Sequence, residues 1–298
     1  MSNQSSDPKT SGPELPEQIT AIRTGGLDGY RIQTPLCTGT VYSQGAHVTE
    51  WTPAGQEPVL WMSKDTDFEA DKPIRGGIPI CWPWFGPGPE GNRTPAHGFA
   101  RILPWSLVAA EVTEAGEARL AFELSGSQCP PDGGIPADAV ARLTVGFGST
   151  LTLNLTVTAG NQPVRYEEAL HTYLNLGDIS RVSVEGLSGA RFLDKVHGGE
   201  AVQDGAIEFT TETDRIYFCA ETLTLVDHSL GRRIQIQKAD SANTVVWNPW
   251  IAKAGTMADF EDDGWRRMCC IEAVNCLANE ISLEAGESHT MTTAILVP

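Results

Sequence analysis

LTLNLTVT, the stretch from Leu151 to Thr158, alternates apolar and polar residues without a break. In an extended chain Leu151, Leu153, Leu155 and Val157 point to one side, and the threonines and the asparagine point to the other. A period of two residues is typical of a strand that has one buried face, as in antiparallel sheets. The stretch therefore predicts a half-buried antiparallel strand.

Short apolar runs separated by turn-forming residues continue this pattern along the chain. The sequence has 30 glycines and 19 prolines, and no segment keeps a helical period of 3.6 residues beyond one or two turns. This density of strands favours an all-β fold, a large antiparallel β-sandwich. We predict further strands at residues 31–34, 40–42, 59–62, 106–112, 119–124, 139–145, 181–185, 206–209, 223–227, 232–238, 244–247, 268–273 and 290–297.

The domain organisation is predicted to be simple, because no internal repeat and no central linker divides the chain. Residues 1–17 are polar and rich in serine and proline, so we expect a flexible N-terminal tail rather than a signal peptide or a membrane anchor. Residues 18–298 are expected to form a single domain. A monomer is the default expectation for such an architecture.

Composition narrows the function classes. The 298 residues carry 21 Lys and Arg against 38 Asp and Glu, a net charge of 21 − 38 = −17, which argues against binding to nucleic acid or anionic membranes. No apolar run is long enough for a transmembrane helix. The seven cysteines form neither a disulfide framework nor a zinc motif, so we expect free buried thiols and a cytoplasmic location.

Seven segments carry a more specific signal, because together and in order they resemble one enzyme family. They resemble the glucose-6-phosphate 1-epimerase family, within the galactose mutarotase-like superfamily, over residues 25–298. The resemblance implies a supersandwich of antiparallel strands with its active site in an open concave face. The segments are RGGIPICWPWFGP, HGFAR, LHTYLNLGDI, GLSGARFLDK, DRIY, VWNPW and GWRRMCCIEAVN.

The reaction of that family interconverts the α and β anomers of a sugar, and it requires one base and one acid. The base takes a proton from the C1 hydroxyl and the acid protonates the ring oxygen, so the ring opens. The C1–C2 bond then rotates, and the ring closes on the other face. No metal and no other cofactor is needed, because each step is a proton transfer. The resemblance gives the base role to Glu272 and the acid role to His171. Without the resemblance, Glu272 would be interpreted as an ordinary solvent-facing strand residue and His171 as a hydrogen-bonded core or surface histidine.

Substrate binding is implied for four further residues. The resemblance places Arg75 and Arg101 at the 6-phosphate, where guanidinium groups offer bidentate donors, although each could instead pair with a carboxylate. It implies a substrate contact for His97, with a loop-bracing hydrogen bond as the alternative. Asp214 could hold a sugar hydroxyl or cap a turn. Lys195 is expected at the surface.

The aromatic residues leave open choices. Trp84 or Phe85 is expected to line the pocket, whereas Trp247 and Trp250 are expected in the core. Asn248 could reach the pocket or simply form a turn.

Three functions follow: a hexose-6-phosphate 1-epimerase, an aldose 1-epimerase on unphosphorylated sugars, or a non-catalytic carbohydrate-binding sandwich. For the first, we expect Glu272 and His171 to face each other across a pyranose, with the guanidinium groups at its far end.

Overall fold

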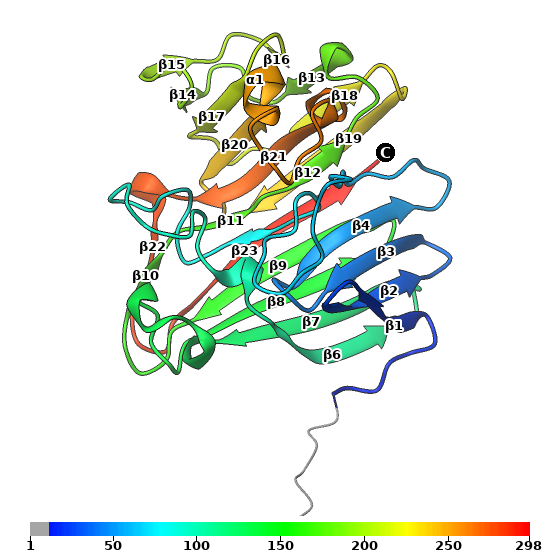
Figure 1. Cartoon of the computed structure of the whole chain (residues 1–298), viewed down its shortest axis with the longest axis vertical. Coiled ribbons are helices and arrows are strands. Elements are labelled where there is room, and N and C mark those ends of the chain that lie inside the picture. The colour runs from blue at the N-terminus through cyan, green and yellow to red at the C-terminus, as the bar shows by residue number, and fades with distance from the viewer. Residues whose placement is uncertain (1–11) are drawn as a thin grey trace, which may run out of the picture.

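A computed structural model describes residues 12–298, and it consists almost entirely of antiparallel sheets (Figure 1). Residues 1–11 of the predicted tail lie outside the described part, and residues 12–16 have no regular secondary structure. The first strand begins at Ile19. The predicted all-β fold is confirmed. No helix within residues 12–298 is long and apolar enough to cross a membrane.

The largest sheet has nine strands and contains the alternating stretch as a central strand. Every apolar residue of that stretch is fully buried, and its polar residues are half-buried, as predicted. The strand order is β16 (Ile207–Glu208), β13 (Val182–Glu185), β18 (Leu223–Asp227), β19 (Arg232–Ala239), β23 (Ser288–Leu296), β9 (Thr150–Thr158), β8 (Val140–Phe147), β7 (Ala118–Ser125) and β6 (Ser106–Val112).

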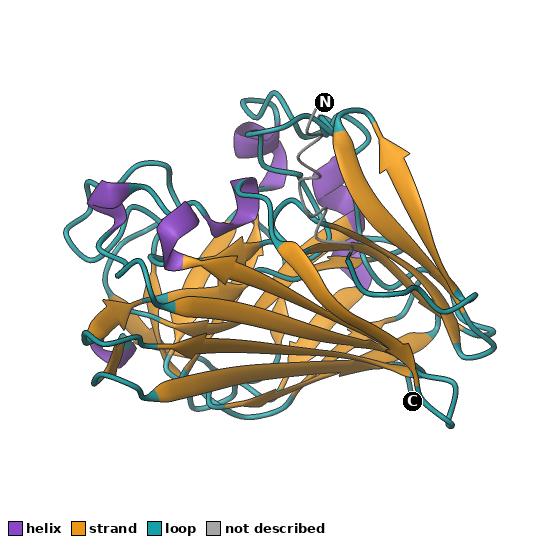
Figure 2. Cartoon of the chain, turned by 90° about the horizontal axis from the view of Figure 1, so that it is seen from below, coloured by secondary structure: helices purple, strands orange, loops and turns teal. Residues whose placement is uncertain are grey.

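Two smaller sheets cover one face of this large sheet, so the molecule has two main layers (Figures 1 and 2). The four-stranded sheet consists of β1 (Ile19–Thr24), β2 (Leu27–Gln33), β3 (Cys37–Tyr42) and β4 (His47–Pro53). The eight-stranded sheet runs β15 (Glu200–Val202), β14 (Arg191–Asp194), β17 (Thr213–Tyr217), β20 (Asn243–Asn248), β21 (Met268–Asn275), β11 (Glu168–Leu170), β5 (Ile80–Cys81), with β12 (Tyr173–Asn175) paired to β21.

The remaining elements are short. A two-stranded sheet joins β10 (Val164–Tyr166) to β22 (Ile281–Leu283), and the one α-helix in the described residues is α1 (Trp250–Ala254). Six 3₁₀ turns complete the described chain: η1 (Ala100–Ile102), η2 (Gly126–Gln128), η3 (Pro131–Gly133), η4 (Ile179–Arg181), η5 (Gly264–Arg267) and η6 (Leu277–Asn279).

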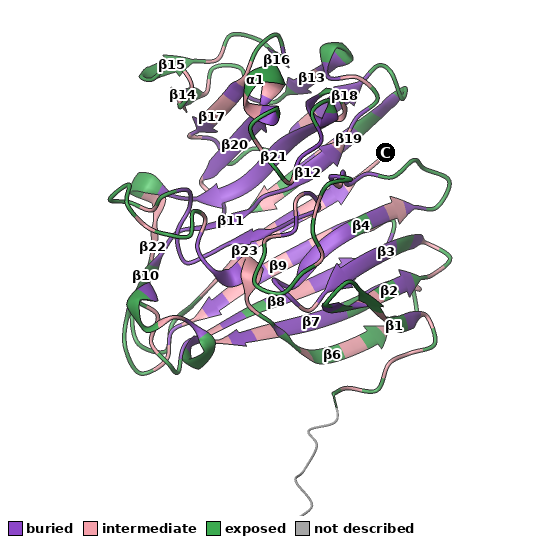
Figure 3. Cartoon of the chain, viewed as in Figure 1, coloured by how far each residue is buried: buried purple, intermediate pink, exposed green. Residues whose placement is uncertain are grey.

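The core lies between the layers, where buried residues form a nearly continuous band (Figure 3). Trp51 of β4 is fully buried and its indole N–H donates to the Gly148 carbonyl at 3.1 Å, which ties the small sheet to the end of β8. Gly39 of β3 lies so close to the Phe147 ring that an added Cβ would be 2.6 Å from it. The layers therefore pack directly on each other.

One strand prediction was wrong. Residues 59–62 do not form a strand, since Leu60 and Met62 make only isolated bridges, to Leu174 and Gly76. These residues are buried connections between sheets, and burial of both faces gives the same apolar run as a strand does. The structure also contains strands that no run predicted, including β1, β4, β14 and β17.

Candidate active site

One row of side chains crosses one face of the eight-stranded sheet. The register pairs Asp214 of β17 with Trp247 of β20, Trp247 with Cys270 of β21, and Cys270 with Tyr173 of β12. Residues that are paired across antiparallel strands point to the same face. The sheet therefore aligns these four side chains in space, although they come from distant parts of the sequence.

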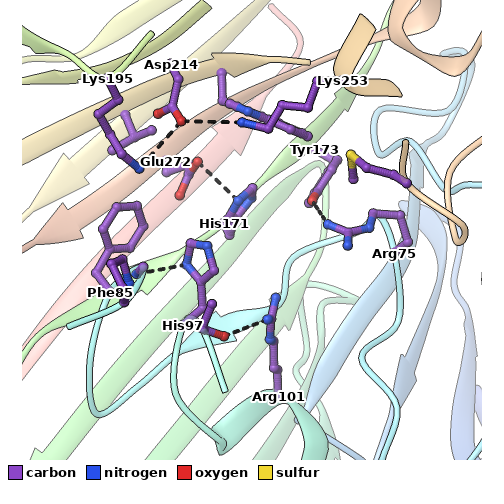
Figure 4. Close-up of a pocket in the computed structure, with 16 residues that line it drawn as sticks. Arg75, Phe85, His97, Arg101, His171, Tyr173, Lys195, Asp214, Lys253 and Glu272 are labelled. Carbon is purple, nitrogen blue, oxygen red and sulfur yellow. Dashed lines mark hydrogen bonds and ion pairs between the residues drawn. The ribbon is translucent and has the colours of Figure 1, made fainter. Parts of the chain in front are cut away.

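Glu272 and His171 form a close pair in the next position along this face. Glu272 is two residues beyond Cys270 on β21, so it points to the same side, and His171 lies between β11 and β12. His171 Nε2 is 3.4 Å from Glu272 Oε1 (Figure 4). The two side chains are 10% and 1% exposed. The predicted arrangement across a pyranose is thus wrong, because no sugar ring fits into that gap.

A loop after β5 forms the neighbouring wall. His97 Nδ1 accepts a hydrogen bond from the Gly86 N–H at 3.3 Å, so a neutral His97 carries its proton on Nε2. The His97 and His171 rings are 5.5 Å apart, and the Phe85 ring is 5.0 Å from His97. Gly98 is required here, because a Cβ would be 2.1 Å from the Trp82 carbonyl oxygen and φ is +70°.

All six predicted site residues line a single cavity (Figure 4). Its volume of about 400 Å³ is in the range of roughly 300–1,000 Å³ typical of small-molecule sites. The residues that line it are Arg75, Phe85, Gly86, Pro87, Ala96, His97, Arg101, His171, Tyr173, Lys195, Asp214, Val245, Trp247, Lys253, Met257 and Glu272.

The two arginines differ in how they are held. Arg75 Nε and the Asp259 carboxylate are 3.1 Å apart, and Arg75 also donates to the Tyr173 hydroxyl at 3.0 Å. Arg101 donates to the Ala96 carbonyl at 2.7 Å, and its buried Nε has no partner within the described residues. The carboxylate pairing considered for both arginines thus occurs for Arg75. Arg101 keeps donors free for a ligand.

Asp214 lies opposite these arginines in the cavity (Figure 4). Its Oδ2 is 3.5 Å from Lys195 Nζ and 4.0 Å from Lys253 Nζ. Asp214 is inside a strand, so the turn-capping interpretation was wrong. Lys195 was expected at the surface, but it lines the cavity and is only partly exposed. No sequence pattern indicated that Lys253 would join it.

The open choices among the aromatic residues are also decided. Phe85 lines the cavity, whereas Trp84 lines a second one that opens elsewhere. Trp247 is buried as expected, but it also lines the cavity. Trp250 packs on Trp265 with ring centroids 4.5 Å apart. Asn248 ends β20 and does not line the cavity, since its amide donates to two backbone carbonyls at 2.8 Å.

The thiols agree with the sequence analysis. All seven cysteines are free and buried. Burial raises the pKa of the Cys270 thiol well above its usual range, and the nearby Glu272 carboxylate adds to this effect. Cys270 is therefore a neutral thiol beside the acid–base pair.

Burial acts on the two members of the pair in opposite directions. It raises the pKa of the Glu272 carboxyl well above its ordinary value, and the charge of Asp214 adds to this. It lowers the pKa of His171 well below its ordinary value, with further lowering by His97 and by the two arginines. In both cases the low dielectric of the site disfavours the charged form. Burial thus favours the uncharged form of both members of the pair.

The ordinary pKa of histidine is about 6.5. Because burial lowers the pKa of His171, we expect its imidazole to be neutral at about pH 6.5. His289 provides the contrast, because its hydrogen bond to Glu168 raises its pKa. Long-range ¹H–¹⁵N spectra of protein labelled at histidine nitrogen measure the protonation states of His171 and His289. The variants His171→Asn and His289→Asn assign the signals. On lowering the pH, His289 becomes an imidazolium first. An imidazolium at His171 before His289 would contradict this description of the site.

Comparisons with known proteins show the family of the chain. The family model described as "Aldose 1-epimerase" matches residues 28–296. A protein of Escherichia coli (strain K12) named "Putative glucose-6-phosphate 1-epimerase" is 39% identical over 263 residues, which cover 86% of this chain and 87% of that protein. A crystal structure described as a "putative mutarotase" from Salmonella typhimurium has a TM-score of 0.87 at 33% identity, covering 96% of this chain and 95% of that one.

A more distant structure shows the fold alone. The galactose mutarotase-like protein from Clostridium acetobutylicum has a TM-score of 0.75 at 12% identity, and the match covers 94% of this chain and 98% of that one. The predicted galactose mutarotase-like fold is confirmed by these similarities.

Proposed function

The chain belongs to the aldose 1-epimerase family, and from this we propose that it interconverts the α and β anomers of hexose 6-phosphates such as glucose 6-phosphate. One observation carries the proposal: a single cavity holds a buried carboxyl–imidazole pair and, beside it, two guanidinium groups. The pair suits the ring-opening chemistry. The guanidinium groups suit a phosphate.

The 3.4 Å contact between His171 and Glu272 fits the reacting atoms. The C1 hydroxyl oxygen and the ring oxygen are both bonded to C1, so an acid and a base that serve them must be neighbours. Once the carboxyl proton has moved from Glu272 to His171 across this contact, Glu272 takes the proton from the C1 hydroxyl, and His171 protonates the ring oxygen as its bond to C1 breaks. The resulting aldehyde rotates about C1–C2, and the ring closes by the reverse transfers.

Three further residues are suited to hold the sugar. His97 presents an Nε2–H, because its Nδ1 is occupied by the Gly86 amide, so it can donate to a sugar oxygen. Asp214 can accept from a sugar hydroxyl, and the two lysines beside it hold its carboxylate in place. The Phe85 ring offers an apolar face to the C–H groups of a sugar.

The phosphate is proposed to bind at Arg101 and Arg75. Arg101 has N–H donors without a partner in the described residues. Arg75 is held in place by Asp259 and Tyr173, and it lines the cavity. The charges of both arginines lower the pKa of His171. A phosphate dianion that neutralised them would raise the pKa of His171 and favour its acid form. Phosphate binding would then assist the chemistry as well as the affinity.

We expect Arg101→Ala to raise the KM for glucose 6-phosphate about 10- to 100-fold, because a hydrogen bond to a charged group contributes about 1.5–3 kcal/mol. Exchange of unphosphorylated glucose should change little, since glucose has no group for Arg101. Both rates are measured by anomer exchange in two-dimensional NMR, after subtraction of the spontaneous rate.

Lys253→Ala is the matched control, because it also removes one positive charge from the cavity but on the Asp214 side. It should affect both sugars alike and leave their ratio unchanged. If Arg101→Ala lowers exchange of glucose and glucose 6-phosphate equally, the protein is an aldose 1-epimerase without phosphate specificity. If the wild-type protein binds sugars without speeding up exchange, it is a non-catalytic binding protein.

A further inference from the structure

Cys270 lies beside two residues that line the cavity, His171 and Glu272, and has no part in the proposed reaction. It is fully buried on β21, and its register partners Trp247 and Tyr173 both line the cavity. Since Glu272 is two residues further along the same strand, both side chains project from the same face. The sheet thus places a thiol directly beside the acid–base pair.

Three different metal-ligating groups meet at this point. One ligand atom each from His171, Cys270 and Glu272 lies within 4.8 Å of the others. Zinc bonds to nitrogen, oxygen and sulfur are about 2.0–2.3 Å long, so ligand atoms around tetrahedral zinc are about 3–4 Å apart. The 3.4 Å between His171 Nε2 and Glu272 Oε1 already has that value. Only a small movement of the thiol is required.

The polar atoms of the cluster are incompletely satisfied. Within the described residues, Glu272 Oε2 and His171 Nδ1 are buried without a hydrogen-bond partner. A cation would stabilise the anionic forms of the carboxyl and the thiol together, with release of their protons. Three protein ligands leave a fourth position open, as in sites where zinc keeps a water. Here that position faces the cavity, which His171 and Glu272 line.

We propose that His171, Cys270 and Glu272 form a site for a soft divalent cation, Zn²⁺ above all, which inhibits the protein reversibly. The thiolate selects zinc over magnesium and calcium, which prefer oxygen ligands. The bound ion occupies both the proposed acid and the proposed base, so it competes with the sugar. Metal binding stands on the geometry alone, whereas inhibition rests on the proposed function.

Cobalt provides the test of binding, because Co²⁺ replaces Zn²⁺ and a Co²⁺–thiolate bond absorbs in the near ultraviolet. We expect the wild-type protein to develop this band with one equivalent of Co²⁺ and to lose it with EDTA. Cys270→Ser should lack the band. Cys269→Ser is the matched control, since Cys269 is the adjacent, equally buried residue of β21 and points to the opposite face. It should keep the band.

Anomer exchange measures the inhibition separately. The Zn²⁺ concentration that halves exchange should be at least about 100-fold higher for Cys270→Ser than for wild type. Even the loss of a residue that only supports a ligand typically weakens metal binding about 10- to 100-fold. Cys269→Ser should be as sensitive as wild type, and Mg²⁺ should not inhibit. If Cys270→Ser does not fold, Cys270→Ala and Glu272→Gln serve instead, and each should weaken the cobalt band.

The two readouts separate the two proposals. No cobalt band in the wild type, or an equal band in Cys270→Ser, overturns the metal site even where exchange is fast. A band that depends on Cys270, in a protein without any exchange activity, leaves the metal site standing and overturns the proposed function. Equal Zn²⁺ sensitivity of Cys270→Ser and wild type overturns the assignment of inhibition to this site.

Discussion

Glu272→Gln is expected to lower the rate of anomer exchange by about 10²- to 10⁴-fold, the usual contribution of a general base. Glutamine has almost the same shape as glutamate and keeps a hydrogen-bonding oxygen, but it cannot accept the proton of the C1 hydroxyl. Since the carboxyl is 1% exposed, water cannot easily replace it as the base. Two-dimensional exchange NMR on glucose 6-phosphate gives the rate directly.

Binding and folding provide the controls for this variant. Glu272 is a buried residue of β21, a strand inside the eight-stranded sheet, so its replacement must be shown to leave the structure intact. We expect the melting temperature to be retained, because burial already favours the uncharged carboxyl that glutamine imitates. Affinity for glucose 6-phosphate should also be retained. Wild-type exchange rates in a folded Glu272→Gln protein would remove Glu272 as the base.

His171→Asn is expected to have an effect of similar size, about 10²- to 10⁴-fold in turnover. Asparagine can hydrogen-bond to the ring oxygen, but it cannot transfer a proton to it. The imidazole stacks on Tyr173 with ring centroids 4.8 Å apart, which holds its orientation. Exchange NMR with saturating substrate measures the loss in turnover.

A second histidine–glutamate pair gives a matched control. His289 Nε2 is 3.1 Å from Glu168 Oε1, but this pair does not line the cavity. His289→Asn should therefore leave the exchange rate near the wild-type value. Because the acid and the base act as a unit, the double variant His171→Asn with Glu272→Gln should be little worse than either single variant. Fully additive losses would show that the two residues act independently.

The sequence predicted several strands of the large sheet well. Strands at residues 106–112 and 223–227 have the predicted bounds, and the alternation in β9 reports its one buried face. β4 was missed because both faces of this strand are largely buried, which removes the alternation of buried and exposed residues. β17 was missed because its sequence TDRIY contains two adjacent charged residues, of which Asp214 lines the cavity. Local pattern fails where tertiary contacts decide burial.

The candidate site also divides into residues that local motifs predict and residues that only the tertiary structure brings together. Motifs identified six of the residues that line the cavity, but not the partners that fix them. Asp259 is far from Arg75 in sequence, and nothing local indicates that they meet. Tyr173 could have been found, because it is two residues from His171 on an extended chain. The adjacency of Glu272 and His171 depends on the pairing of β21 with β11 and β12, which no single segment encodes.

The central claim is that one sugar phosphate contacts the acid–base pair and the guanidinium groups at the same time. A crystal structure of Glu272→Gln with glucose 6-phosphate tests it most directly, because the substrate persists in a slow variant. We predict the C1 hydroxyl within hydrogen-bond distance of residue 272 and the phosphate on Arg101 and Arg75. A phosphate bound to Lys195 and Lys253 instead, with C1 turned away from His171, would contradict the account.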